Sequence, residues 1–174
     1  MKLFCFGKKK SIGSVLKNHY DEMLKCIEDD PNAHNVQFEL LPAMYVVCDI
    51  AAIESGKNRK EFAGKVMSEI RKLDECRYLD VFNNRVNLYG QVVRGKQLRA
   101  EWLLGNNPDM PTNPIQKIAI ALGDVMINPH CPDNYEDAPL LISDVFSVLS
   151  FSEAMKKVFA ELNSLYNDVC KMEG

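Results

Sequence analysis

The feature that most constrains the fold is a stripe of apolar residues that recurs at helical spacing between residues 62 and 93. The mean step between its members is about 3.4 residues, close to the 3.5-residue repeat of helices that pack along one face. No proline or glycine interrupts residues 65–89. We therefore expect one long, basic helix over residues 59–93. Its stripe comprises Phe62, Val66, Ile70, Leu73, Cys76, Leu79, Phe82, Val86, Tyr89 and Val93.

Two features within this segment leave an alternative open. Asn83 and Asn84 are poor helix formers, and they mark the point at which the long helix would divide in two. From Val86 to Val92 apolar and other residues also alternate, which is the pattern of a β-strand. The sequence alone therefore permits either a helix or a short hairpin over residues 83–95.

The N-terminal half contains two further helical patterns. Residues 11–28 carry apolar residues at steps of three and four, which places them on one helical face. A second helix is expected to begin around Pro42, because the fixed φ of proline suits a first turn. This segment, residues 42–55, is apolar nearly all round, so it is expected to be the central, buried helix.

The C-terminal half is expected to contain three or four helices. A helical turn or two is predicted over residues 97–104, and a helix over residues 114–127 is expected to be capped by Thr112 or Asn113. Another helix is expected over residues 140–149. The sequence from Ser150 to Glu153 then fits a capping box, which predicts that a separate last helix begins there.

Together these patterns predict an all-α, single-domain bundle of six or seven helices. A chain of 174 residues has the usual size of one domain. Residues 1–10 are expected to be a flexible, basic N-terminus, and residues 11–174 a single helical domain.

The apolar segments also indicate where in the cell the protein is expected. The longest apolar run, residues 40–53, has 14 residues and contains Asp49, whereas a membrane span needs about 20. The N-terminal residues lack the apolar core of a signal peptide, and contact with a membrane is disfavoured. We expect a cytoplasmic protein with reduced thiols. Its cysteines, which show no pairing pattern, are Cys5, Cys26, Cys48, Cys76, Cys131 and Cys170.

Motifs for catalysis and for cofactor binding are missing from the sequence. There is no nucleophile elbow, phosphate-binding loop or dinucleotide-binding turn. The three histidines lack the spacing of zinc ligands, so neither a metal nor a cofactor is expected. An enzymatic activity is neither indicated nor excluded, and a non-enzymatic role is favoured.

The net charge of −3 conceals an uneven distribution. Residues 56–102 carry 11 basic and 6 acidic residues, a balance of +5, whereas residues 103–174 carry 4 and 10, a balance of −6. Within the basic part, Arg94, Lys96 and Arg99 lie close to Tyr89 and Trp102. Cations beside large aromatic residues are typical of interfaces, so these five residues form a candidate surface for a protein partner or an anionic ligand.

Asp49 is the other candidate for a binding residue. A carboxylate within an apolar helix is costly unless it is paired, and perturbed carboxylates gather at functional sites. The alternative is structural: Asp49 then lies at the helix edge in solvent, or pairs with an arginine of the basic segment. The structural interpretation is favoured.

Three hypotheses about function follow. The first is a protein-interaction module, such as an adaptor, an inhibitor or an immunity-like protein, that uses a charged helical face. The second is a small-molecule or nucleotide-binding enzyme with a polar site between helices near Asp49. The third is weak nucleic-acid binding through residues 57–99, which the acidic isoelectric point near 5.7 and the scarcity of stacking aromatics disfavour.

Overall fold

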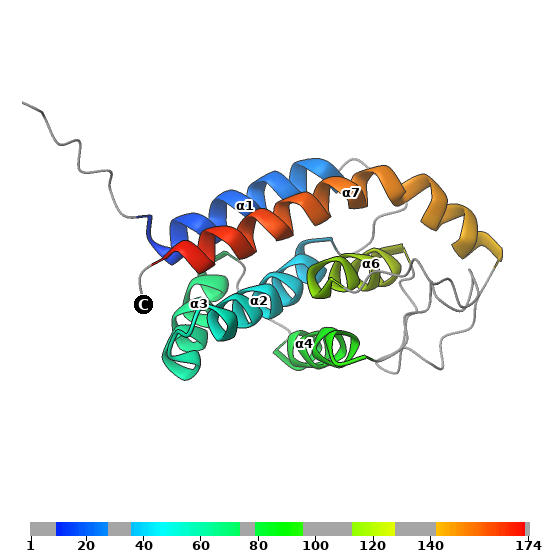
Figure 1. Ribbon diagram of the computed structural model, residues 1–174. Helices are drawn as coiled ribbons and strands as arrows, with labels where there is room; N and C mark the ends of the chain where they lie inside the picture. Colours follow the sequence, from blue (N-terminus) through cyan, green and yellow to red (C-terminus); the bar gives the residue numbers. More distant parts are fainter. Residues whose placement is uncertain (1–9, 28–35, 74–78, 96–112, 128–141, 173–174) are drawn as a thin grey trace, which may run out of the picture.

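The computed structural model describes residues 10–27, 36–73, 79–95, 113–127 and 142–172, and these residues form six helices. The helices are α1 (Ile12–Ile27), α2 (Val36–Glu54), α3 (Arg59–Leu73), α4 (Leu79–Val93), α6 (Pro114–Ile127) and α7 (Ile142–Lys171). The predicted all-α bundle is confirmed (Figure 1). The predicted turns at residues 97–104 lie outside the described residues.

Helix α2 is the centre of the bundle, as its apolar sequence predicts. It contacts each of the other five described helices, and its residues from Leu40 to Ala52 are largely buried. A helix that is apolar nearly all round needs neighbours on every side. Those neighbours are α1 and α7, which lie side by side along one face, and α3, α4 and α6 (Figure 1).

Helix α2 begins earlier than expected. It starts at Val36, so Pro42 lies inside the helix and not in its first turn. Proline removes one backbone hydrogen bond and is costly in a helix interior. Here Leu40 and Leu41 precede it in the helix and are buried in the core. We infer that their packing offsets the lost bond.

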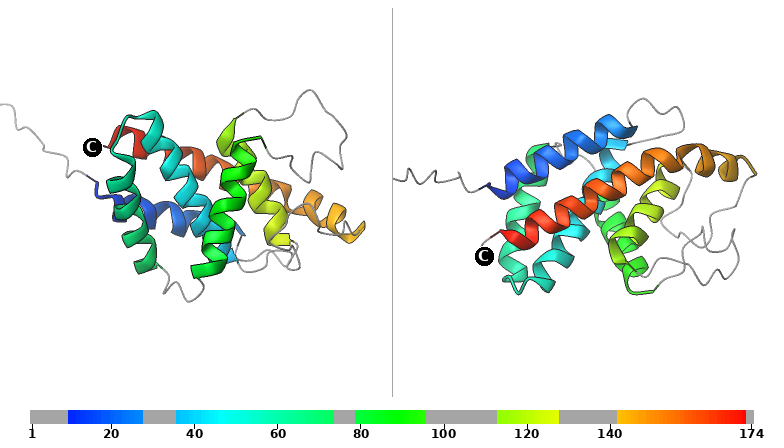
Figure 2. Two further views of the ribbon diagram at one scale, coloured as in Figure 1. Left: turned by 90° about the horizontal axis from the view of Figure 1, so that it is seen from below. Right: turned by 45° about the horizontal axis from the view of Figure 1, so that its top comes forward.

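The prediction of a single long helix over residues 59–93 is wrong. Helix α3 ends at Leu73 and contacts α1 and α2, whereas α4 contacts α2 and α6, and α3 and α4 share no contact. The two helices lie apart and run in roughly opposite directions (Figure 2). Both halves of the apolar stripe therefore pack on α2, which is why the periodicity continues across the break.

The details of α4 resolve the alternatives left open for residues 83–95. Asn83 and Asn84 lie within α4 and are exposed, so they do not divide a helix. The hairpin is excluded, because the residues up to Val93 are helical. Gly95 follows with a φ of 107°, a conformation that glycine adopts without strain.

The last helix also differs from the prediction. Helix α7 is continuous over 30 residues, from Ile142 to Lys171, so Ser150 and Glu153 lie inside it and do not start a new helix. The sequence of α7 contains no proline or glycine to end it. Glutamate is also a good helix former in an interior position, so a capping-box pattern does not require a helix start.

The predicted cap of α6 is confirmed. The Asn113 Oδ1 atom accepts hydrogen bonds from the backbone N–H groups of Ile115, at 2.8 Å, and Gln116, at 3.4 Å. Pro114, which has no N–H to satisfy, occupies the first helical position.

We expect Asn113→Ala to lower the free energy of unfolding by about 1 kcal/mol, because it removes this cap. Chemical denaturation measures the effect. Asn113→Asp keeps an acceptor in the same place and should retain most of the stability. An equal loss in both variants would show that the cap contributes little.

Candidate functional site

One face of the central helix is less covered than the others. Tyr45 and Asp49 are half-buried and Ile53 is 52% exposed, and they follow one another at four-residue steps along α2. The Tyr45 ring packs edge-on against Phe82 of α4, with centroids 5.9 Å apart. These three α2 residues, together with the exposed residues of α3 described next, form what we call the α2–α3 surface.

The exposed side of α3 is strongly basic. Residues 57–73 contain six basic and two acidic residues, a balance of +4. Lys65 pairs with Glu61 at 2.7 Å and Lys72 pairs with Glu69 at 2.6 Å. The remaining cations of α3 are Arg59, Lys60 and Arg71.

Lys60 and Arg71 are exposed and make no ion pair with any residue that the structure describes. They are three helical turns apart and therefore share one side of α3. Glu69, nearly opposite them on the helix, lies against Gly13 of α1. Lys60 and Arg71 consequently face away from α1, and Gly64 between them has open space beside it.

Asp49 is engaged in a structural ion pair. Its two carboxylate oxygens accept hydrogen bonds from Arg59 Nε at 2.8 Å and from Arg59 Nη2 at 2.7 Å. The Asp49 side chain is 20% exposed and the Arg59 side chain 65%. The hydrogen bond to Asp49 raises the pKa of Arg59. The arrangement matches the ion-pair alternative considered for Asp49, and it links α2 to the start of α3.

Tyr89, one of the two aromatic residues of the predicted cluster, belongs to the core. Tyr89 is completely buried in α4. It lies by a buried ion pair in which Arg85 Nε donates to the two Glu39 oxygens at 3.0 and 2.9 Å. Burial raises the pKa of Glu39, while the charge of Arg85 and its hydrogen bonds to the carboxylate oppose that shift. These side chains hold α4 on α2.

Arg94 is the one predicted cation of the cluster that the structure describes. Arg94 directly follows the last residue of α4 and is exposed, whereas Tyr89 is buried. Lys96, Arg99 and Trp102 lie outside the described residues. Of the three predicted binding residues that the structure describes, Asp49 contributes to the α2–α3 surface, whereas Tyr89 and Arg94 do not.

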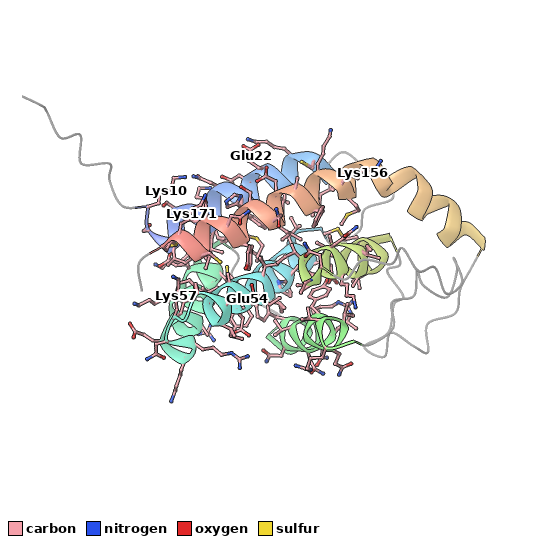
Figure 3. All side chains as sticks on the ribbon, in the orientation of Figure 1. Lys10, Glu22, Glu54, Lys57, Lys156 and Lys171 are labelled. Atoms are coloured by element: carbon pink, nitrogen blue, oxygen red, sulfur yellow. The ribbon has the colours of Figure 1, made fainter. Side chains whose placement is uncertain are left out.

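A small pocket between α2, α6 and α7 was not predicted from the sequence. Its volume is about 220 Å³. The Tyr166 hydroxyl of α7 donates a hydrogen bond to the Glu54 carboxylate of α2, which raises the pKa of Tyr166. Figure 3 shows Glu54 near the end of α2, before Lys57. The pocket is lined by Ile50, Glu54, Asn113, Pro114, Ile115, Asn163 and Tyr166.

A third polar contact, also unpredicted, joins α1 to α7. His19 is nearly buried, with Nδ1 at 2.9 Å from Glu161 Oε2 and Nε2 at 3.5 Å from Asp168 Oδ2. Glu161 and Asp168 are seven residues apart and lie on one side of α7. No signal in the sequence pairs residues 142 positions apart, as His19 and Glu161 are.

The described helices thus define an all-α bundle with a basic, incompletely covered surface on α2 and α3 and a small pocket between α2, α6 and α7. Within the described ranges, no helix is long and apolar enough to cross a membrane, and no cluster of three or more His, Cys, Asp or Glu side chains is arranged to hold a metal ion. Comparison with protein families, with curated proteins and with solved structures finds no match to this chain.

Proposed function

We propose that this chain is a protein-interaction module that binds an acidic partner on the α2–α3 surface. The observation that carries the proposal is the pair of exposed cations on α3, Lys60 and Arg71, which have no counter-charge among the described residues. Opposite charge on a partner would steer the encounter and set the orientation of the complex.

The adjoining part of α2 supplies the other element of an interface. Ile53 is a large, exposed apolar residue one turn from the Asp49–Arg59 pair. An apolar contact surrounded by charged residues is the usual composition of a protein interface. The surface therefore offers both apolar burial and charge complementarity to the same partner.

The enzyme hypothesis, which places a polar site between helices near Asp49, has less support. Asp49 is held in a bidentate pair with Arg59 and is not among the lining residues of the pocket between α2, α6 and α7. The nucleic-acid hypothesis also has less support. Tyr45 is the aromatic residue of the α2–α3 surface, and its ring packs against Phe82. A stacking platform for bases would need more aromatic residues than this.

We place the interaction in the cytoplasm. Cys26, Cys48 and Cys170 are free thiols, which fits a reducing compartment. Burial raises the pKa of the Cys26 and Cys48 thiols, which disfavours the reactive thiolate form.

Photo-crosslinking from position 64 tests the proposal. A photo-reactive amino acid in place of Gly64 would lie between Lys60 and Arg71 on the open side of α3. In native cells we expect a crosslink to one protein, through a peptide rich in Asp and Glu. The double substitution Lys60→Glu and Arg71→Glu should reduce the adduct at least about tenfold, since close interfacial charge pairs are worth several kcal/mol.

The matched control is Lys17→Glu with Lys25→Glu, which makes the same charge change on the exposed side of α1. It should leave the adduct unchanged. Equal losses of the adduct in both double variants would show that the effect comes from net charge, and would contradict binding at a defined surface. A crosslink to nucleic acid, or to a peptide without acidic residues, would overturn the proposal.

A further inference from the structure

The pocket between α2, α6 and α7 carries an inference that is independent of the α2–α3 surface. Three helices from distant parts of the sequence meet there. Ile50 and Ile115 provide apolar walls, and Glu54, Tyr166 and Asn163 provide polar groups. A concave site with mostly apolar walls and a few convergent polar groups is the usual form of a ligand site.

The start of α6 does not make this pocket an anion site. Helix N-termini bind anions through free N–H groups, but Pro114 has none, and Asn113 already accepts from the next two residues, Ile115 and Gln116. The N–H of Lys117 donates to the Asn113 carbonyl. The first turn of α6 therefore has no N–H left to offer an anionic group.

The charge of the pocket instead favours a cation. Glu54 is its one ionisable acid, and the lining residues include no Lys, Arg or His. Tyr166 donates to one Glu54 oxygen, Oε2, and thereby orients the carboxylate. A carboxylate has acceptor sites on both oxygens, so it retains the capacity to accept further hydrogen bonds from a ligand.

We infer that the pocket binds a small organic cation, with its ammonium group on Glu54 and its apolar body between Ile50 and Ile115. The Asn163 amide, which is half-buried at the pocket wall, adds a donor and an acceptor for a second polar group. The pocket volume of about 220 Å³ lies below the roughly 300–1,000 Å³ of drug-sized sites. A single ring with a short aminoalkyl arm is therefore an appropriate probe.

Methyl NMR of the full chain with labelled isoleucine tests this inference. Benzylammonium should produce saturable shifts of the Ile50 and Ile115 methyl signals. Benzyl alcohol, which has the same ring without the charge, should bind at least about fivefold more weakly, because it cannot form an ion pair with the Glu54 carboxylate. Benzoate should produce no saturable shift.

Two variants make the test specific to Glu54. Glu54→Gln should weaken benzylammonium binding at least about fivefold, since it removes the counter-charge but keeps the size of the side chain. Glu22→Gln, an equal change on an exposed part of α1, should leave binding unchanged. The ligand-free spectra of both variants report whether the fold is intact.

Three results would overturn the inference. They are the absence of saturable shifts with benzylammonium, equal binding of benzyl alcohol, and equal binding by wild type and Glu54→Gln. None of these results bears on the crosslink from position 64, so the two proposals fail separately.

Discussion

Arg85→Met should lower the free energy of unfolding by about 3–5 kcal/mol, because it leaves the Glu39 carboxylate buried without its counter-ion. The Glu39 side chain is only 6% exposed and the Arg85 side chain 12%. Water therefore cannot replace the lost guanidinium. Urea denaturation at pH 7 measures the difference from wild type.

A second substitution separates charge from packing. Adding Glu39→Gln to Arg85→Met removes the unpaired charge and keeps a polar side chain of the same size. The double variant should recover most of the lost stability. If both variants were equally destabilised, the loss would come from packing around Arg85 and not from a buried charge.

The same variant has a defined pH dependence. Burial already raises the pKa of Glu39, and removing Arg85 takes away the charge that opposes the shift, so the pKa rises further. A carboxyl group with a raised native-state pKa contributes stability below its unfolded pKa, and that contribution is lost as the pH rises through the native value. The deficit of Arg85→Met should therefore shrink between pH 7 and pH 5, and this trend should vanish when Glu39 is also replaced.

Leu162→Ala should lower the free energy of unfolding by about 2–5 kcal/mol, because it removes buried apolar surface and leaves a cavity. Leu162 is completely buried in α7, which packs on α1, α2 and α6. Ser164→Ala, two residues along on the exposed side of the same helix, is the matched control and should change the stability by less than about 0.5 kcal/mol. Thermal or urea unfolding checks both. Similar effects of the two changes would contradict the position of Leu162 in the core.

Local patterns predicted much of the fold because they depend on neighbours in the sequence. The spacing of apolar residues located α1 and α6, and the polar residue before Pro114 located a helix cap. The all-round apolar character of residues 42–55 identified the central helix. In each case the residues that determine the structure lie within a few turns of one another.

The predictions of helix boundaries fail where tertiary contacts, and not the local sequence, determine the structure. The apolar stripe of residues 62–93 has one period although it spans two helices, because both helices pack on α2. Pro42 remains inside α2 because the residues before it are buried. Propensity and capping rules describe isolated helices, and packing overrides them.

The candidate sites were harder to predict than the fold. Asp49 could be identified as unusual, but its partner Arg59 belongs to another helix and could have been any of several arginines. The Glu39–Arg85 pair joins residues 46 positions apart. The pocket assembles residues of α2, α6 and α7, so no local pattern could have indicated it.

The lack of contact between α3 and α4 has a consequence for communication within the molecule. Helix α3 touches only α1 and α2 among the described helices, whereas the pocket is built from α2, α6 and α7. Among the described helices, the route that the two sites share directly is α2, which contributes residues to both. Since α2 carries Ile53 of one site and Glu54 of the other, any thermodynamic linkage between the two ligands would depend on how rigidly its last turn is held.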